Sequence, residues 1–313
     1  MMNNPKPISE FLVPGKRTHL VGIGGVSMCP LAEVLAGKGL LVQGSDMMES
    51  DSVKHLRSKG ISVAIGHNAE NLGDCDFVIR TAAVHDGNPE IAGAIARGIP
   101  VYERAQAWGT LMRKYPNALC VSGTHGKTTT TSMCTHIFMA AELDPTVMIG
   151  GTLPLLHSGY RVGQGDTIIL ESCEYCNSFL NFFPTVAVIL NVEEDHLDFF
   201  KDLADIEHSF HAFADLVPQR GYIISNADDA GARDSVKGLQ HPVFTFAVQD
   251  RTADCVADNV SFFDGCPVFD VVIHGEVYAH VELKIPGKHN ILNTLAAASA
   301  AYVLGLPGEA VSR

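Results

Sequence analysis

The sequence has few basic residues for its length. Its 313 residues include 22 lysines and arginines against 35 aspartates and glutamates, which gives a formal net charge of −13. A surface with such an excess of negative charge repels polyanions. The composition therefore excludes a broad binding surface for nucleic acid or for an anionic membrane, and any phosphate-bearing ligand must be held locally, by a loop.

Long apolar runs are also missing. No segment approaches the ~20 apolar residues that span a bilayer, and the opening MMNNPKPISEFLVPG lacks the basic-then-apolar pattern of a secretory signal. We therefore expect a cytoplasmic protein without membrane insertion, of unknown oligomeric state. Its 46% hydrophobic residues are ordinary for a globular protein, and a usual domain size of ~100–200 residues predicts two domains.

The eight cysteines lack the spacing of a disulfide framework or of a structural zinc site. Several lie in apolar runs, such as Cys120 and Cys134, which is typical of buried reduced thiols. Cys173 and Cys176 form a CxxC pair, but no second CxxC or HxxxH pair supplies the remaining ligands that zinc requires. We expect a packing role for this pair, with metal or redox use as the alternative.

The order of apolar segments predicts two α/β domains. Strands and helices alternate over residues 18–102, as in βαβ units with a parallel sheet, so residues 1–107 are expected to form a Rossmann-like domain. Residues 108–313 begin with a strand, a glycine loop and a helix, which predicts a central P-loop-type α/β ATPase domain. Over residues 252–283 the pattern changes to strands joined by Asp-Gly and His-Gly turns, which predicts a small antiparallel β edge.

The first glycine loop, VGIGGVSM, lies between a strand and a helix. Gly22, Gly24 and Gly25 could hold a nucleotide phosphate, with Asp46 at the end of the next strand as a ribose-binding acid. Ser27 stands where the third glycine of a strict GxGxxG pattern belongs. A nucleotide phosphate, a nicotinamide or flavin cofactor, and a purely structural turn all remain open for this loop.

The second glycine loop, VSGTHGKTTTTSM, covers residues 121–133. Its Gly-Lys-Thr is typical of a phosphate-binding loop at a helix N-terminus, although Val121 replaces the first glycine of GxxxxGK[ST]. In such a loop Lys127 contacts the β- and γ-phosphates and the Thr128 hydroxyl binds Mg²⁺. The alternative is a structural turn in which Lys127 meets only solvent.

Acidic residues and a histidine follow two later strands. The segment IILESCEYCNSF contains Glu171 and Glu174, and VAVILNVEEDHLDFF contains Asp195, His196 and Asp198. Ligands of open α/β sheets bind outside the carboxyl ends of the strands, where the glycine loop also lies. Because Mg²⁺ takes few protein ligands, Thr128, Glu174 and His196 are a sufficient set. A solvated acidic loop is the alternative.

Several segments together resemble the ATP-dependent Mur ligases. They are GTHGKTTTTSM, ESCEYCNSFL, NVEEDHLDFF and IPGKHNILN, with HLVGIGGVSM and GSD near the N-terminus. The match runs in order along nearly the whole chain, and it is nearest to the branch of the family that adds L-alanine to UDP-N-acetylmuramate in peptidoglycan precursor synthesis. His125 belongs to the signature of that branch.

The resemblance implies the ligands of both loops. The first domain would hold the UDP part of the substrate through Gly22, Gly24, Gly25, Ser27 and Asp46, which removes the support for a nicotinamide cofactor. The family's loop has the form GTxGKT, so Val121 is expected there. The implied ATP-binding residues are Gly123, Thr124, His125, Gly126, Lys127, Thr128, Thr129, His289, Asn290 and Asn293. Lys127, Glu174 and His196 would be catalytic, and Thr128, Glu174 and His196 would bind Mg²⁺.

The implied reaction is transfer of phosphate from ATP to the lactyl carboxylate of UDP-N-acetylmuramate, followed by attack of the L-alanine amine. The family's ligases have a third domain that closes over ATP, and the sequence ends at LGLPGEAVSR, about where the linker to it is expected. We therefore expect slow turnover or none from this chain alone. A nucleotide-binding oxidoreductase and a non-catalytic regulator with the ligase fold are the alternatives.

Overall fold

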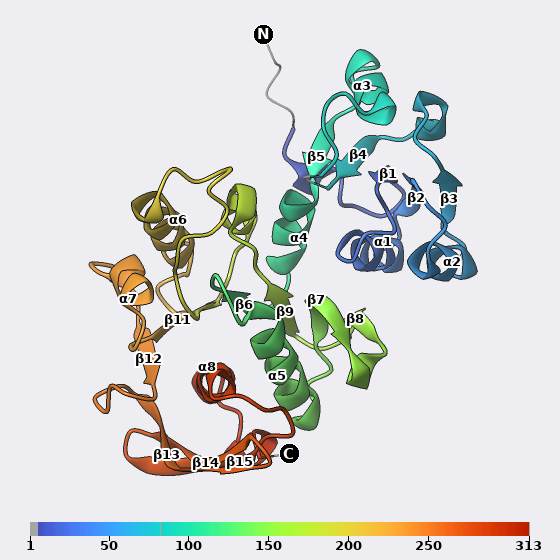
Figure 1. Ribbon diagram of the computed structural model, residues 1–313. Coiled ribbons are helices and arrows are strands. Elements are labelled where there is room, and N and C mark those ends of the chain that lie inside the picture. Colours follow the sequence, from blue (N-terminus) through green and yellow to red (C-terminus); the bar gives the residue numbers. More distant parts are fainter. Residues whose placement is uncertain (1–5, 82, 313) are drawn as a thin grey trace. The chain divides into compact units, whose positions relative to one another are not determined.

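The computed structural model describes residues 6–81 and 83–312, and the chain divides into two compact units, residues 1–111 and 112–313 (Figure 1). The elements of the first unit are η1 (Ile8–Glu10), β1 (Arg17–Val21), α1 (Met28–Gly37), β2 (Leu41–Asp46), α2 (Asp51–Ser58), β3 (Ser62–Ile65), η2 (Ala69–Leu72), β4 (Phe77–Arg80), α3 (Pro89–Ala96), β5 (Val101–Glu103) and α4 (Arg104–Met112), where η marks a 3₁₀ helix. Helix α4 crosses the division between the units.

The first unit contains a five-stranded sheet in the order β3-β2-β1-β4-β5, and every pairing in it is parallel. Strands buried on both faces need near-continuous apolar runs, and Leu20, Val21 and Phe77 to Ile79 are fully buried accordingly. This order is that of a Rossmann-like sheet. The expectation for the first domain is confirmed in its fold class.

The second unit is built on a ten-stranded mixed sheet in the order β15-β14-β13-β12-β11-β10-β6-β9-β7-β8. Its strands are β6 (Asn117–Ser122), β7 (Thr146–Leu153), β8 (Ser158–Arg161), β9 (Thr167–Glu171), β10 (Val186–Ile189), β11 (Tyr222–Asn226), β12 (Val243–Ala247), β13 (Cys255–Phe263), β14 (Cys266–Ile273) and β15 (Glu276–Glu282). Its helices are α5 (Lys127–Ala140), η3 (Pro154–Leu156), η4 (Tyr175–Asn181), α6 (Leu203–Ala214), α7 (Ala230–Val236), α8 (His289–Val303) and η5 (Gly308–Ala310).

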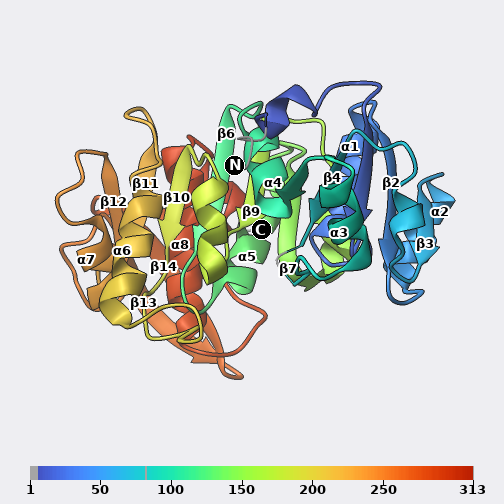
Figure 2. The same ribbon diagram turned by 90° about the horizontal axis from the view of Figure 1, so that it is seen from above.

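Helices cover both faces of this sheet. Figures 1 and 2 show α5 and α8 on one face and α6 and α7 on the other. The chain leaves β6 through α5 toward β7, whereas it leaves β10 through α6 toward β11, in the opposite direction along the sheet. The strand order therefore reverses beside β6, and in open α/β sheets ligands bind at such a switch point.

The two ends of the sheet are antiparallel. Strands β13, β14 and β15 form consecutive antiparallel pairs, and β8 pairs with β7 in the same way at the opposite end. The antiparallel edge expected from residues 252–283 is confirmed. The hairpin at the β8 end was not expected from the sequence.

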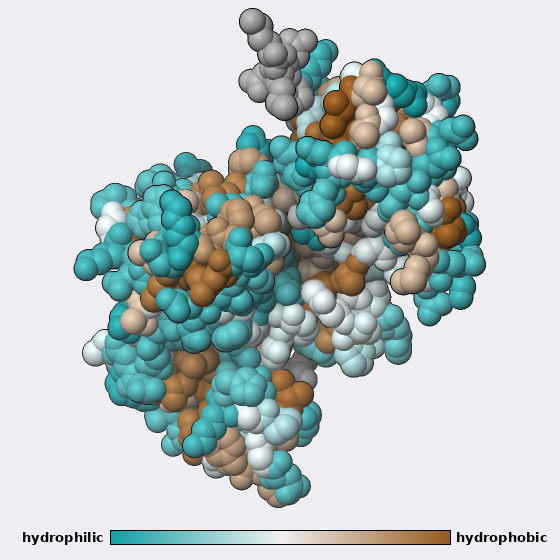
Figure 3. Space-filling model, turned by 45° about the horizontal axis from the view of Figure 1, so that its top comes forward, coloured by the Kyte–Doolittle hydropathy of each residue, from teal (hydrophilic) through white to brown (hydrophobic). Residues whose placement is uncertain are grey.

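Figure 3 shows a mostly hydrophilic face, on which apolar residues lie in small groups. Among the described residues, none of the helices combines the length and the apolar character needed to cross a bilayer. The alanine-rich helix α8 is buried along most of its length, because small side chains allow close packing against α5 and the sheet.

Candidate nucleotide and metal site

The second glycine loop connects β6 to α5 in the second unit. Gly123 has φ +141° and Gly126 has φ +83°, a conformation that side-chain-bearing residues rarely adopt. Space is also short, because a Cβ on Gly126 would lie 2.6 Å from Asn293 Oδ1 and one on Gly123 would lie 2.9 Å from Leu190 Cβ. Both glycines are required for the loop to hold its shape at the N-terminus of α5.

The segment after β10 fastens this loop. Thr124 N donates to Asn191 O over 3.0 Å, and His125 N donates to Asn191 Oδ1 over 2.7 Å. The amide of Asn191 in turn donates to His125 O over 3.1 Å. The His125 side chain is 70% exposed, with Nε2 3.9 Å from Glu193. The loop backbone is therefore fixed, while the imidazole faces solvent.

Lys127 occupies the first turn of α5 and points back into the loop. Its Nζ lies 3.1 and 3.2 Å from the two carboxylate oxygens of Glu174, and it also donates to Gly123 O and Thr124 O over 2.5 and 3.1 Å. Glu174 is only 2% exposed. A charge this deeply buried needs a partner, and Lys127 supplies it. The alternative in which Lys127 meets only solvent is therefore excluded.

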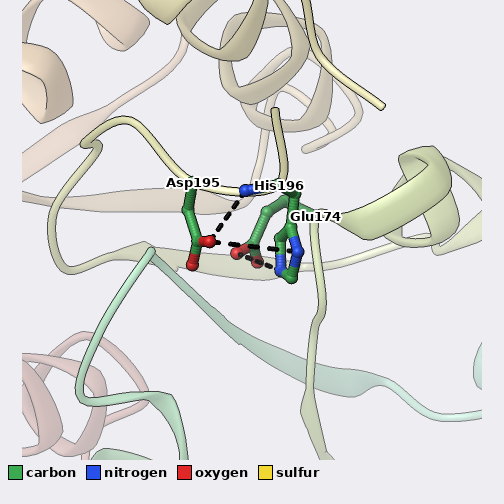
Figure 4. Close-up of side chains that lie close together, drawn as sticks. All are labelled: Glu174, Asp195 and His196. Atoms are coloured by element: carbon green, nitrogen blue, oxygen red, sulfur yellow. Dashed lines mark hydrogen bonds and ion pairs between the residues drawn. The ribbon is translucent and has the colours of Figure 1, made fainter. Parts of the chain in front are cut away.

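Glu174, Asp195 and His196 form a compact group (Figure 4). His196 Nε2 lies 3.8 Å from Glu174 Oε1, and His196 Nδ1 lies 3.9 Å from Asp195 Oδ1. One nitrogen or oxygen atom from each of the three residues lies within 4.8 Å of the others, so the group could hold a metal ion. Asp195 was not among the expected metal ligands, although it directly precedes His196 in the sequence.

Several non-glycine residues around this group have left-handed backbone. His196 has φ +51°, and Cys176 and Asn177 each have φ +53°. Such conformations cost on the order of 1–3 kcal/mol and persist where surrounding contacts hold them, commonly at functional sites. Here the Tyr175 ring lies 4.7 Å from the His196 ring, centroid to centroid, with the two planes tilted by 43°, and its hydroxyl donates to Asp198 over 2.8 Å.

Thr128 is paired with a different carboxylate. Its hydroxyl donates to Glu171 Oε1 over 3.0 Å, and Glu171 Oε2 accepts from Gly150 N over 2.6 Å. A Cβ on Gly150 would lie 2.5 Å from Glu171 Oε1. One carboxylate at the end of β9 thus joins the start of α5 to strand β7. Glu171 was expected only as a strand-end acid, whereas Glu174 was selected as the metal ligand, so the contacts of Glu171 with Thr128 and Gly150 were not foreseen.

The N-terminus of α8 reaches the loop through Asn293. Thr130 Oγ1 donates to Asn293 Oδ1 over 3.2 Å, and Asn293 Nδ2 donates to Asn290 Oδ1 over 3.0 Å. His289 is exposed at the start of the helix, beside Gly287. Of the three residues expected near the adenine, the structure brings Asn293 to the glycine loop, and Asn290 is bonded to Asn293.

The first glycine loop lies in the other unit, between β1 and α1. Ser45 O accepts from both Gly22 N and Ile23 N over 2.9 Å, and Asp46 Oδ2 accepts from Gly24 N over 2.8 Å. A Cβ on Gly24 would lie 2.9 Å from the same carboxylate oxygen. Asp46 therefore contacts the loop backbone directly, and its role as a ribose-binding acid stays a prediction.

Ser27 faces α4. Its hydroxyl accepts from Arg104, and its carbonyl accepts from Trp108 Nε1 over 3.2 Å. Ser27 thus fastens the end of the loop to the last helix of the unit, a structural contact that the sequence did not indicate.

Glu90, on helix α3 of the first unit, is a fully buried carboxylate that the sequence did not indicate. It accepts from Ser45 Oγ over 2.5 Å and from Asn71 Nδ2 over 2.7 Å, and His19 Nε2 lies 3.3 Å away. Burial acts to raise the pKa of Glu90, but the hydrogen bonds from His19, Ser45 and Asn71 outweigh it and lower the pKa to about 2. Glu90 is therefore ionised inside the unit and holds the end of β2 beneath the first loop.

Known proteins resemble the chain over nearly its full length. A UDP-N-acetylmuramate–L-alanine ligase of Clostridium novyi is 45% identical over 296 residues, which is 95% of this chain and 64% of that protein. One of Acetivibrio thermocellus is 44% identical, again over 95% of this chain and 64% of the relative. The chain thus spans 64% of the length of these two curated relatives.

Solved structures share the fold. The crystal structure of UDP-N-acetylmuramate-alanine ligase from Thermotoga maritima matches with a TM-score of 0.82 and 31% identity, over 95% of this chain and 67% of that chain. The structure of UDP-N-acetylmuramate:L-alanyl-gamma-D-glutamyl-meso-diaminopimelate ligase from Neisseria meningitides matches with a TM-score of 0.83 and 27% identity, over 95% of this chain and 96% of that chain.

Two family models match in sequence order. Residues 17–116 match the model described as Mur ligase family, catalytic domain, and residues 121–301 match the Mur ligase middle domain. The second match alone covers more than half of the chain, and it contains the glycine loop, Glu174 and His196. The chain belongs to the Mur ligase family.

Proposed function

We propose that this chain carries the substrate-binding and nucleotide-binding parts of a UDP-N-acetylmuramate:L-alanine ligase, an ATP-dependent ligase of peptidoglycan precursor synthesis that works in the cytoplasm. The observation that carries the proposal is the contact of Lys127, in a phosphate-loop turn, with Glu174 beside Asp195 and His196. The curated relatives carry the name of this activity, and the chain spans 64% of their length.

ATP is assigned to the loop between β6 and α5. Backbone N–H groups at a helix N-terminus attract a phosphate, but the helix dipole supplies only ~0.3–1 kcal/mol at exposed sites. Most of the binding energy must therefore come from Lys127 and from the loop amides. We assign Gly123 to Thr129 to the phosphates, and His289, Asn290 and Asn293 to the adenine side.

Mg²⁺ fits the acidic groups beside this loop. Mg²⁺ prefers oxygen ligands and keeps substrate phosphates and waters in the rest of its coordination sphere. Glu174, Asp195 and His196 offer one such position, and Thr128 with Glu171 offers a second set of oxygens close to the first turn of α5. We infer that Glu171 and Asp195 join Thr128, Glu174 and His196 in binding the cation. When bound, it neutralises phosphate charge.

The first unit is assigned to the UDP part of the substrate. Gly22, Gly24 and Gly25 allow a diphosphate to approach the backbone between β1 and α1, and Ser27 and Asp46 border the same loop. Since Asp46 and Ser45 already fix the loop through three backbone N–H groups, it is pre-organised for a ligand.

In the proposed reaction the protein positions the substrates and stabilises the charge on the transferred phosphoryl group. A lactyl carboxylate oxygen of UDP-N-acetylmuramate attacks the γ-phosphorus of ATP, and ADP leaves. The amine of L-alanine attacks the resulting acyl phosphate at carbon, and phosphate leaves as the amide forms. Lys127 stabilises charge on the transferring phosphoryl group. No covalent bond to the enzyme is required.

Calorimetry with each ligand separately tests the proposal. We expect one site for UDP-N-acetylmuramate and one for ATP with Mg²⁺ on the same chain. Tight binding of NADH without competition from the UDP-sugar would instead support an oxidoreductase. Binding of both ligands without alanine-dependent phosphate release, even when the part of a curated relative that this chain does not span is supplied in trans or by fusion, would favour a non-catalytic regulator.

A further inference from the structure

The thiols of this chain differ sharply in their access to solvent. Cys120, Cys134 and Cys255 are fully buried, and burial raises the pKa of each to about 12. A thiol in this state is inert, because the thiolate is the reactive form. Cys173 is half-buried and Cys176 is exposed. The expectation that Cys176 is a packing residue is therefore wrong, since it is exposed near the start of η4.

The backbone brings these two cysteines to the ends of one turn. Glu174 has φ −73° and ψ −26°, and Tyr175 begins the 3₁₀ helix η4. One turn of 3₁₀ helix contains three residues and rises about 6 Å. A disulfide joins Cα atoms that are about 4.4–6.8 Å apart. Residues 173 and 176 thus have the backbone separation that a disulfide needs.

We propose that Cys173 and Cys176 are a reversible disulfide site that controls Glu174. The oxidant is a low-molecular-weight disulfide such as oxidised glutathione. The exposed Cys176 thiolate attacks it and releases one thiol, and the Cys173 thiolate then displaces the second thiol from the mixed disulfide. One S–S bond breaks and one forms, both cysteines lose their protons, and the two protons leave on the two released thiols.

The disulfide encloses the two residues that organise the metal group. Glu174 contacts Lys127 and His196, and the Tyr175 ring packs at a tilt against the His196 ring. In the dithiol form Cys176 is exposed and left-handed at φ +53°. Drawing its side chain toward the half-buried Cys173 rotates the peptides on either side of Tyr175. Glu174 then leaves its position between Lys127 and His196.

Mass spectrometry of the whole chain tests whether the bond forms. After incubation with oxidised glutathione we expect a loss of two hydrogens, mapped by peptide analysis to Cys173 and Cys176 and reversed by dithiothreitol. The Cys176→Ser variant should instead stop at a mixed disulfide or remain reduced, while Cys266→Ser, which changes a thiol at the start of β14, should oxidise like the wild type. A wild type that gains only glutathione adducts would overturn the proposal.

Calorimetry with ATP and Mg²⁺ tests the control of Glu174, and this readout rests on the proposed function. The oxidised chain should bind about tenfold or more weakly than the reduced chain, whereas Cys176→Ser should bind equally well before and after treatment. Equal affinity of the oxidised and reduced wild type would overturn the control of Glu174. A reduced wild type that does not bind ATP contradicts the proposed function instead, and the mass measurement still decides whether the disulfide site exists.

Discussion

At the scale of single residues, Lys127 links the glycine loop to the buried carboxylate of Glu174. Because Glu174 is 2% exposed, removing the lysine leaves a buried negative charge without its partner, next to the place assigned to the phosphates of ATP. Electrostatic repulsion is thereby added to the loss of the phosphate contact.

We expect Lys127→Ala to weaken ATP binding by about 10- to 100-fold, since a hydrogen bond to a charged group is worth about 1.5–3 kcal/mol. UDP-N-acetylmuramate binding, assigned to the other unit, should stay nearly unchanged. Calorimetry with each ligand measures both effects. Lys201→Ala, which removes an exposed lysine before α6, is the matched control. If both affinities fall together, the assignment of two loops to two ligands is wrong.

A substitution at Gly150 tests the role of Glu171 by a steric effect, without changing any charged or hydrogen-bonding group. A Cβ at Gly150 would lie 2.5 Å from Glu171 Oε1, whereas one at Gly151 would meet Thr128 Cγ2 at an ordinary 3.4 Å. We expect Gly150→Ala to displace Glu171 and to reduce the gain in ATP affinity that Mg²⁺ provides, and Gly151→Ala to preserve it. Titrations with Mg²⁺ and with EDTA supply the comparison. An undiminished Mg²⁺ effect in Gly150→Ala argues against Glu171 as a cation ligand.

The sequence predicted part of this site. Strand-end position was enough to place Glu174 and His196 at the edge where the loop lies, since the carboxyl ends of parallel strands share one edge. It selected Glu174 but did not show that Glu171 has partners of its own, because the left-handed turn at Cys176 and Asn177, which sets the two carboxylates apart, depends on tertiary contacts. One such contact is the bond between Ser209 and Asn177.

At the scale of elements, the two hairpins formed by β13, β14 and β15 owe their form to two turns. Asp264 and Gly265 have φ +47° and +79°, and His274 and Gly275 have φ +49° and +86°. Two consecutive positive φ values are those of the type I′ turn that joins twisted antiparallel strands. This is why Asp-Gly and His-Gly were sufficient to predict the edge.

Gly275→Ala isolates the cost of that conformation, because nothing lies within 4 Å of the added Cβ. A residue with a side chain in left-handed backbone costs about 1–2 kcal/mol, so the free energy of unfolding should fall by that amount. Gly37→Ala also adds a methyl in open space, but at the last residue of helix α1, where the backbone is not left-handed, and should raise the free energy of unfolding by no more than about 0.5–1 kcal/mol. Urea denaturation compares the two, and changes of the same sign would contradict the argument.

The strands and helices that sequence reasoning missed are short or weakly patterned. Strand β8 is half-buried throughout and β3 has a single fully buried residue, so neither shows a clear apolar alternation. The buried strands β6, β9 and β10 were predicted because parallel strands at the centre of a sheet require continuous apolar runs. Strands such as β3 and β8 form because neighbouring strands pair with them, and the sequence of a single segment does not show that pairing.

At the scale of the whole molecule, the two sheets imply two cooperative units that can be followed separately. The single tryptophan, Trp108, is buried in the first unit. Its fluorescence therefore reports the unfolding of residues 1–111, while circular dichroism reports both units.

Glu90 makes the stability of the first unit dependent on pH. Its pKa is lowered from 4.5 to about 2 on folding, so its contribution is complete above pH 4.5 and is lost as the pH falls from 4.5 toward 2. Glu90→Gln should lower the free energy of unfolding of the first unit by about 3 kcal/mol at pH 7. The difference in this free energy between variant and wild type should be smaller at pH 3.5. Urea titrations followed by Trp108 fluorescence measure this. Asp74→Asn, at an exposed position, is the control, and its effect on the free energy of unfolding should not depend on pH in this way. If Glu90→Gln lowers the free energy of unfolding equally at both pH values, the ionised carboxylate is not the source of the stabilisation.

The strand order of the second sheet has a consequence for synthesis on the ribosome. The first unit pairs its five strands only with one another, so it can be complete before the rest of the chain emerges. Strand β6 is then made first of the second sheet, yet its neighbours β9 and β10 begin only at Thr167 and Val186. At roughly 5–20 residues per second, an apolar strand with both edges unpaired waits for seconds. During that interval the nascent chain is most exposed to aggregation and most in need of a chaperone.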